Sequence, residues 1–385
     1  MKSVYFDHAA TTPVDPRVLD EMLPYFTERY GNPSEIHRLG REARTAVEVA
    51  RARVAAALGA GEREIVFTSG GTEGDNLALS GYLQRFEPGH FIISAVEHPA
   101  VMEVARALNR LGWAVDFVPV DGDGVVDVEA YERAFRGDTR LASVMFANNV
   151  VGTLQPVAEL ARIAHEHGAV FHSDAVQAVG SLPVNVAELG VDMLTLSGHK
   201  LYGPKGIGAL YVKRGTRLAP LLHGGGHERR LRSGTENVPG IVGLGAALEL
   251  AVNEMEVTRP RVEALRDRLA AGVLEAIPEV RYLGHPTMRL PGNVSFTVRY
   301  IEGESMLLQL DAHGFMVSSG SACASGSLEP SHVILALGLG AEEAHGSVRL
   351  SLGRENTPEE ADAFLEVFPP IVEKLRNMSP LYVKG

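Results

Sequence analysis

The stretch Ser197-Gly198-His199-Lys200-Leu201-Tyr202-Gly203-Pro204-Lys205-Gly206 decides how the rest of the chain is organised. The short apolar run 192–196 comes before it, and a run of this length between polar residues is typical of a buried strand. Lys200 therefore follows a strand at the edge of an open α/β sheet where ligands bind. Most lysines are solvated surface charges. This one stands beside His199 and before a Gly-Pro-Lys-Gly turn, and a desolvated lysine at a strand end can form a Schiff base.

The composition is that of a globular protein with enough apolar residues for two cores. The chain has 385 residues, of which 45% are hydrophobic and 22% charged. A net charge of -12 argues against nucleic acid or an anionic membrane as a partner. The single cysteine, Cys323, excludes an internal disulfide and a multi-cysteine metal site. We see no apolar run of membrane-spanning length and no signal-peptide core, so we expect a cytoplasmic protein.

The first two thirds of the chain predict an α/β domain. Apolar runs with the length of strands alternate with helical segments, such as one at 156–167. The predicted strands are 64–68, 90–94, 114–118, 141–147, 169–173, 192–196 and 207–213. Helical crossovers between strands indicate a seven-stranded, mostly parallel sheet with helices on both faces. A short turn alone joins the last two strands, so we expect the last strand to be antiparallel.

The remainder predicts a smaller α+β domain. A helix predicted at 239–256 is followed by shorter strands at 293–298, 314–318 and 347–352, and Thr357 opens a further helix as a capping box. We therefore assign residues 15–256 to a large domain, and 1–14 with 257–385 to a small domain that carries Cys323. Near the N-terminus, Asp15 is predicted to cap a helix with Pro16 at its first position, and a second helix is predicted at 41–58.

Polar residues follow several of the predicted strands at the same edge of the sheet as Lys200. The glycine-rich stretch 69–76 opens a helix and can present backbone N–H groups to an anion, although a tight turn is the alternative. Asp174 comes about one strand–helix–strand step before Lys200; it is either a helix cap or the partner of a protonated ring nitrogen. His98 is either structural or stacked on a cofactor, and Asn149 could be a turn residue.

Three further features bear on function. His223 and His227 flank three glycines, which would not hold the helix that places such a pair on one zinc ion, so we predict no metal site. Cys323 lies among small residues at 318–327; free cysteines are usually buried, but this setting favours a mobile loop with an exposed thiol. Arg349 lies in an apolar strand and needs an anion, either an acidic side chain or a substrate carboxylate.

Together these motifs resemble cysteine desulfurases of the group related to the nitrogenase and housekeeping iron–sulfur systems. This group is a branch of the class V aminotransferases with the fold-type I pyridoxal-phosphate architecture. The resemblance runs from residue 7 to residue 382 and is most specific at 197–206, 224–229 and 318–323.

The resemblance implies pyridoxal phosphate as cofactor and assigns a role to each matching residue. Lys200 would link to the cofactor and His98 would stack on its ring. Asp174 would pair with the ring nitrogen and Gln177 with the ring hydroxyl. The phosphate would be held by Gly71, Thr72, Ser197 and His199, and by Thr235 from the neighbouring subunit of a homodimer. Asn149 and Arg349 would bind the substrate, and Cys323 would be the nucleophile.

The implied reaction converts L-cysteine to L-alanine. Lys200 removes the α-proton, Cys323 takes the sulfur as a persulfide, and an iron–sulfur scaffold or a tRNA-thiolation enzyme accepts it. An aminotransferase or a selenocysteine lyase would share the cofactor site without needing Cys323. A non-catalytic scaffold would not need Lys200, Asp174 and His98, and a nicotinamide enzyme would need a Gly-x-Gly-x-x-Gly motif that is absent after the first predicted sheet strand.

Overall fold

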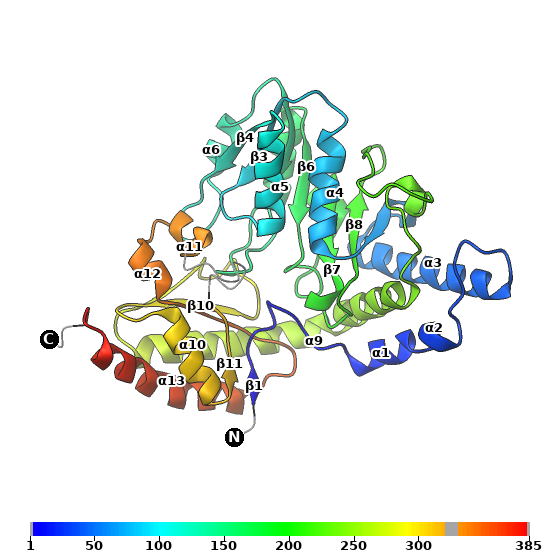
Figure 1. Ribbon diagram of the computed structural model, residues 1–385. Coiled ribbons are helices and arrows are strands. Elements are labelled where there is room, and N and C mark those ends of the chain that lie inside the picture. Colours follow the sequence, from blue (N-terminus) through cyan, green and yellow to red (C-terminus); the bar gives the residue numbers. More distant parts are fainter. Residues whose placement is uncertain (1–2, 320–329, 383–385) are drawn as a thin grey trace.

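A seven-stranded sheet forms the centre of the computed structural model, which describes residues 3–319 and 330–382 (Figure 1). Its strands lie in the order β2-β8-β7-β6-β5-β3-β4. They are β2 Ile65–Thr68, β3 His90–Ser94, β4 Ala114–Val118, β5 Thr139–Ser143, β6 Val170–Asp174, β7 Met193–Ser197 and β8 Gly208–Val212. Neighbours from β7 to β4 are parallel, and β8 is antiparallel to β7 and β2. The predicted sheet is confirmed, including its antiparallel last strand.

One predicted strand of the large sheet was wrong by more than one residue at both ends. We expected it at 141–147, whereas β5 spans Thr139–Ser143. Val144, Met145 and Ala147 stay buried after Ser143. This segment still follows β6, because the N–H groups of Val144 and Phe146 donate to the carbonyls of His172 and Asp174 at 3.1 and 2.8 Å. The apolar run therefore continues past the end of the strand, and hydrophobicity alone could not locate that end.

Alternate residues of each central strand pack into different cores, because successive side chains point to opposite faces of a sheet. In β7, Leu194 and Leu196 join the core that contains α3 and α7, whereas Met193 joins the core of α4 and α5. These helices are α3 Arg38–Leu58, α4 Gly71–Leu83, α5 Pro99–Arg110 and α7 Val157–Glu166. All residues of β2, β3, β7 and β8 are buried, and the predicted helices on both faces of the sheet are confirmed.

Capping residues in the sequence mark the start of α1 (Pro16–Met22) and the end of α3. The Asp15 side chain accepts from the N–H of Arg17 at 2.8 Å and caps α1, in which proline stands at the first turn. Gly59 ends α3 in the left-handed conformation, with φ of 65°, which a glycine adopts without strain. The other short α-helices of this part of the chain are α2 Pro24–Thr27, α6 Val128–Arg133 and α8 Val186–Leu189.

The C-terminal third forms a second, smaller α+β core. A three-stranded antiparallel sheet has the order β12-β10-β9, and β1 pairs with β11 in parallel. The strands are β1 Val4–Tyr5, β9 Val280–Tyr282, β10 Asn293–Val298, β11 Phe315–Met316 and β12 Ser347–Ser351. The helices are α10 Gly303–Ala312, α11 His332–Ala336, α12 Ala341–His345 and α13 Pro358–Met378, which begins with the predicted capping box. The N-terminal strand thus joins the C-terminal sheets (Figure 1).

The helix α9 Val238–Ala276 joins the two cores. We predicted its end at residue 256, which was wrong, because the helix continues through Pro260. Its first part packs into the large core through residues such as Leu244, and its last part packs into the small core through Leu265 and Leu269. Apolar residues that recur at helical spacing after Pro260 outweigh the one hydrogen bond that proline removes. The division of the chain at residues 15 and 257 stays a prediction.

The same helix tests the expectation about membranes. Within the described residues, α9 alone is long and apolar enough to cross a membrane, with a mean hydropathy of 1.2 over 18 residues. The prediction that no run reaches this length is therefore wrong on composition. Because 56% of that window is buried inside the protein, α9 matches the core helix of a folded domain.

Removal of the Phe6 side chain should destabilise the small core. Phe6 is fully buried, with its ring centroid 6.2 Å from that of Phe315 and 6.1 Å from that of Phe364. Phe6→Ala should lower the free energy of unfolding by about 3–5 kcal/mol, measured by urea denaturation. Phe117→Ala, at a position that is 43% exposed, is the control and should cost less than about 1 kcal/mol. Equal losses in the two variants would contradict this account of the core.

Candidate active site

One cavity of about 860 Å³, partly open to solvent, collects most of the predicted site residues. It lies beyond the carboxyl ends of β6 and β7, where Asp174 and Ser197 are the last residues of their strands and Lys200 ends the short turn that follows. The predicted residues that line it are Gly71, Thr72, His98, Asn149, Asp174, Gln177, Ser197, His199, Lys200 and Arg349. The structure therefore brings together the residues predicted to follow strands of the large sheet, and Arg349 reaches the same cavity from β12 of the small sheet.

Of the two other predicted site residues, one does not line this cavity and one is not described by the structure. Thr235 is exposed in the loop before α9. Cys323 lies outside the described residues. The segment that leads to it does start beside the cavity, because Ser318 and Arg349 exchange two backbone hydrogen bonds of 3.0 and 2.7 Å.

The N-terminus of α4 offers a place for an anion. Gly70 has a φ of 156°, and a Cβ on Gly71 would lie 2.8 Å from a methyl group of Val176, so the loop needs glycine to pack this closely. An adjoining hollow is lined by this loop together with His199 and Lys205. Burial, with the charges of Lys200 and Lys205, lowers the pKa of His199 to about 4, so its ring is neutral at pH 7. Free N–H groups and a nearby lysine suit a phosphate.

Asp174 is a buried carboxyl group that suits a bound cation. Its Oδ1 accepts from the N–H of Val176 at 2.9 Å. Burial raises the pKa of Asp174, while the nearby His98 and Lys200 oppose that shift. A carboxylate that is deprived of water gains most from a positive charge placed against it. This is the environment that a protonated pyridine nitrogen requires, so the donor set fits pyridoxal phosphate.

Two acidic residues near Asp174 were missed by the sequence analysis. Asp75 lines the cavity, and burial, with the nearby charge of Asp174, raises its pKa well above the usual range. Glu97 is fully buried and accepts from the hydroxyl of Ser94 and the N–H of Met145, at 2.5 and 2.8 Å. Burial raises the pKa of Glu97 to about 8. Asp75 lies at the end of the glycine-rich stretch 69–76 and Glu97 stands beside His98, but only their burial in the fold distinguishes them from ordinary acidic residues.

Lys200 extends toward the N-terminal segment. Its Nζ donates to the carbonyl oxygens of Ala9 and Ala10, at 2.5 and 2.8 Å. The segment is held against the lysine turn because the N–H of Thr12 donates to the carbonyl of His199 and the Thr12 hydroxyl accepts from the N–H of Tyr202. Residues 9 and 10 had no predicted role, since a backbone carbonyl leaves no signature in a sequence.

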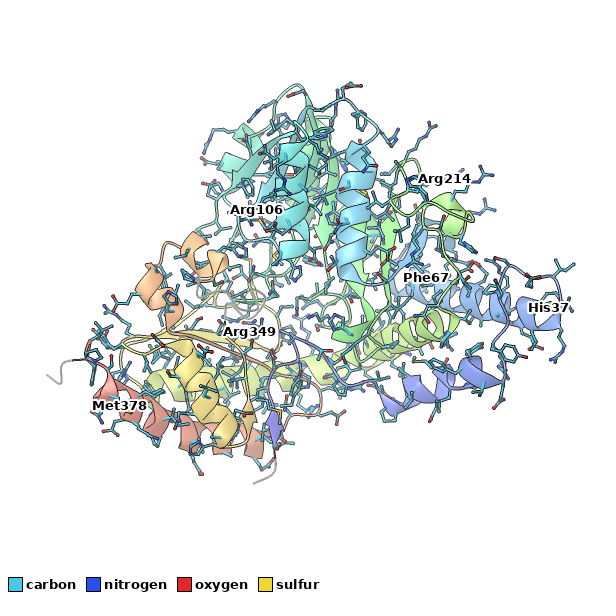
Figure 2. All side chains as sticks on the ribbon, in the orientation of Figure 1. His37, Phe67, Arg106, Arg214, Arg349 and Met378 are labelled. Atoms are coloured by element: carbon cyan, nitrogen blue, oxygen red, sulfur yellow. The ribbon has the colours of Figure 1, made fainter. Side chains whose placement is uncertain are left out.

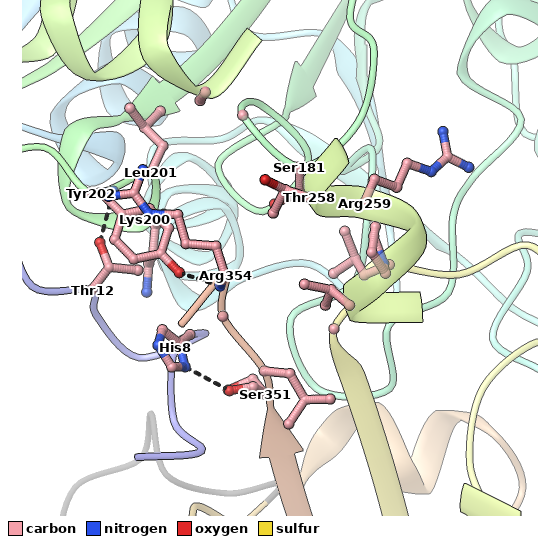
Figure 3. Close-up of a pocket in the computed structure, with 18 of the residues that line it drawn as sticks. His8, Thr12, Ser181, Lys200, Leu201, Tyr202, Thr258, Arg259, Ser351 and Arg354 are labelled. Carbon is pink, nitrogen blue, oxygen red and sulfur yellow. Dashed lines mark hydrogen bonds between the residues drawn. The ribbon is translucent and has the colours of Figure 1, made fainter. Parts of the chain in front are cut away.

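A second cavity of about 890 Å³ lies beside the first and shares Ala9, Gln177 and Lys200 with it. Figure 3 shows His8 and Ser351 below Lys200, with a hydrogen bond of 3.0 Å from the His8 ring to the Ser351 carbonyl. Lys200 therefore stands between two hollows, and the N-terminal segment contributes to the walls of both.

Arg349 is the buried arginine for which the sequence predicted an anion. Its side chain is 3% exposed. Nη1 donates to the carbonyl of Asn149 and Nη2 to the carboxylate of Asp7, both at 2.9 Å. Nε has no hydrogen-bond partner among the described residues. Figure 2 shows Arg349 at the small sheet, whose strand β12 contains it. The anion is therefore an acidic side chain, Asp7, which the sequence analysis did not single out.

Comparison with known proteins gives the family. Residues 4–364 match the model of the family described as aminotransferase class-V. The chain belongs to this family. It is 53% identical over 385 residues to a protein named cysteine desulfurase IscS from Methanosarcina thermophila, with 100% of this chain and 95% of that protein covered. A protein of the same name from Dictyoglomus turgidum is 50% identical, with 98% and 97% covered.

Solved structures agree with this assignment. A structure titled NifS-like protein has a TM-score of 0.92 and 40% identity, with 97% of this chain and 100% of that chain covered. A structure titled SspA in complex with cysteine has a TM-score of 0.80 and 36% identity, with 92% and 99% covered. The predicted family, its α/β fold and the resemblance to cysteine desulfurases are confirmed.

The raised pKa of Glu97 should make stability depend on pH. The folded protein keeps a proton on Glu97 that the unfolded chain has lost above about pH 4.5, so the folded state loses stability as the pH rises from about 4.5 to about 8. Glu97→Gln cannot titrate and keeps an acceptor for Ser94. The free energy of unfolding of Glu97→Gln, minus that of the wild type, should therefore increase by on the order of 1 kcal/mol per pH unit across this window.

The measurement is urea denaturation of both proteins at several pH values between 5 and 8. Glu103→Gln, at an exposed position of α5, is the control for the loss of one carboxylate. Parallel stability curves for the wild type and Glu97→Gln would show that Glu97 is ionised in the folded protein.

Proposed function

We propose that this protein is a cysteine desulfurase that converts L-cysteine to L-alanine and passes the sulfur on as a persulfide of Cys323. The observation that carries the proposal is the gathering of Lys200, Asp174, His98 and Arg349 around one cavity. The full-length similarity to proteins named cysteine desulfurase supports it. The acceptor of the sulfur would be an iron–sulfur scaffold or a tRNA-thiolation enzyme, in the cytoplasm.

Enzymes of this family depend on pyridoxal phosphate, which when bound supplies an electron sink for the bonds around the substrate α-carbon. Lys200 would bind the cofactor covalently, and Asp174 would keep its ring nitrogen protonated. Gln177 would reach the ring hydroxyl and His98 the ring face. The phosphate would be held by Gly71, Thr72, Ser197 and His199.

The residues of the chain would then bind the substrate and move its proton. Arg349 would bind the α-carboxylate through the donor on Nε, beside Asn149. The amine of Lys200, once released from the cofactor, would accept the α-proton. Asp174, buried beside that lysine, would keep the negative charge that balances the protonated ring.

Cys323 would complete the reaction by taking the sulfur. Its thiolate would attack the substrate sulfur, so that an S–S bond forms as the bond from sulfur to Cβ breaks and alanine is left. Ser318, which pairs with Arg349, precedes Cys323 by only a few residues. An extended chain spans at most about 3.5 Å per residue, so a main chain of five residues can reach at most about 18 Å from Ser318. This short tether supports delivery of the thiol to the cavity.

We also infer a homodimer in which Thr235 of each chain reaches the phosphate site of the other. The exposed position of Thr235 supports this. Large apolar side chains are also exposed along one short part of the chain, where a soluble monomer gains nothing from them: Leu19 43%, Leu23 51%, Phe26 57%, Tyr30 66% and Ile36 88% exposed. We assign this stretch to the dimer interface.

The variant Cys323→Ser tests the sulfur-transfer step. Serine nearly keeps the volume, but its hydroxyl is un-ionised at neutral pH, so the nucleophile is lost while the cofactor site stays intact. The variant should bind pyridoxal phosphate and change its absorbance with L-cysteine, yet release alanine at least ~100-fold more slowly. Ser321→Ala, in the same stretch, is the control and should keep most of the activity. Wild-type alanine release by Cys323→Ser would favour an aminotransferase or lyase instead.

The variant Phe26→Asp tests the proposed interface. A charge in a buried apolar contact should raise the dimer dissociation constant by on the order of 100-fold, because the carboxylate loses its water without gaining a partner. Sedimentation equilibrium measures the change. Leu111→Asp, at a position 71% exposed at the end of α5, is the control and should stay dimeric. A fully active wild-type monomer would contradict the dimer itself, and a wild-type dissociation constant in Phe26→Asp would move the interface elsewhere.

A further inference from the structure

Asp7 occupies the edge of Arg349 that a carboxylate ligand would need. A guanidinium binds a carboxylate best through two parallel N–H donors. Nη1 of Arg349 is directed to the carbonyl of Asn149, so Nε and Nη2 form the edge that remains. Nε has no partner among the described residues, whereas Nη2 donates to the carboxylate of Asp7 at 2.9 Å. On this edge of the guanidinium, Nε is therefore available to a ligand, whereas Nη2 is already bonded to the protein.

We propose that Asp7 is a resident counter-ion of Arg349, which the carboxylate of the substrate must displace, and that it thereby sets the specificity of the site. The inference rests on the proposed binding of a substrate carboxylate by Arg349. Two carboxylates on one guanidinium would leave an unbalanced negative charge around an arginine that is only 3% exposed. Such a charge is costly away from water, so ligand and Asp7 exclude each other.

The backbone around Asp7 allows its side chain alone to move. Phe6 on one side is fixed in the small core, and its carbonyl accepts from the N–H of Ser351 at 2.7 Å. On the other side, the N–H groups of His8 and Ala9 donate to the carbonyl and hydroxyl oxygens of Ser351, at 3.1 and 2.8 Å. The Asp7 side chain is 20% exposed, so it can rotate toward water while the main chain stays in place.

Displacement makes binding an exchange of one ion pair for another. A simple anion gains little by it, because it must replace a carboxylate that is already in contact with Arg349. An amino acid that also bonds to the rest of the site offsets that cost. Asp7 therefore weakens the binding of carboxylates in general, and it discourages those that bring no other contact.

The variant Asp7→Asn separates the charge from the shape. The amide keeps an oxygen that accepts from Nη2, while the Coulomb attraction to Arg349 is lost. The probe is 3-mercaptopropionate, which is L-cysteine without its amino group and so cannot link to the cofactor. In calorimetry on the holoenzyme its dissociation constant should fall about tenfold in Asp7→Asn. The KM for L-cysteine should fall similarly, with kcat changed less than about twofold, because only the free enzyme loses stabilisation.

Three further proteins complete the experiment. Asp20→Asn makes the same charge change at an exposed position of α1 and should leave the dissociation constant unchanged. Arg349→Gln should abolish the effect of Asp7→Asn in the double variant, since the two residues act as a pair. Asp7→Ser should show the same tightening and replaces Asp7→Asn if that variant does not fold. Unchanged or weaker binding in the folded Asp7 variant would overturn the proposal, because Asp7 would then orient Arg349 for the ligand.

The outcome is distinguishable from a failure of the proposed function. If the wild type releases alanine from L-cysteine and Asp7→Asn binds the probe no more tightly, the function stands and the role of Asp7 is wrong. If the wild type releases no alanine but Asp7→Asn binds the probe more tightly, the desulfurase proposal is wrong. Asp7 would then still compete with carboxylate ligands for Arg349.

Discussion

The buried guanidinium of Arg349 is the constraint on which the arrangement of the site depends. A charge that is nearly inaccessible to water must be satisfied by the protein. Its partners come from two separate parts of the chain, the carboxylate of Asp7 and the carbonyl of Asn149, and Arg349 itself lies in β12 of the small sheet. The N-terminal segment, a loop beyond the large sheet and the small sheet therefore meet at one side chain. Any movement that separates these parts would leave the arginine without its counter-ion.

Buried acidic groups beyond the end of the large sheet need a positive charge beside them, whereas Arg349 needs a negative one. Asp75, Asp174 and Glu97 are buried, and the charge of Asp174 helps to raise the pKa values of the other two. His172 does not neutralise them, because burial lowers its pKa to about 3 and keeps the ring uncharged. A cation bound against Asp174 would offset the electrostatic cost of burying these carboxyl groups close together. The buried acidic groups therefore favour a positively charged ligand, such as a protonated ring, next to Asp174.

The sequence could predict what periodicity and strand ends determine. Lys200 and Asp174 were placed correctly because each follows an apolar run of strand length, and parallel strands bring their carboxyl ends to one edge. It could not predict the pair Asp7–Arg349, whose members are 342 residues apart and share no motif. Asp75 and Glu97 looked like ordinary helix and loop residues, and their pKa shifts follow from burial. The end of α9 was missed because its last part is held by packing into the small core, a contact between distant parts of the chain that the sequence does not reveal.

The position of Asp7 in the chain links the two ends of the site. Ala9 and Ala10, whose carbonyls accept from the amine of Lys200, follow Asp7 and His8 in a turn that the N–H of Ala10 closes by donating to the carbonyl of Asp7 at 3.0 Å. Ser351 and Thr12 anchor this short segment on either side of Ala10, so its length is fixed. The same backbone therefore determines where Arg349 holds a carboxylate and where Lys200 places its amine. A counter-ion on a freely moving loop would neutralise Arg349 equally well, but it would not hold these two groups at a constant separation.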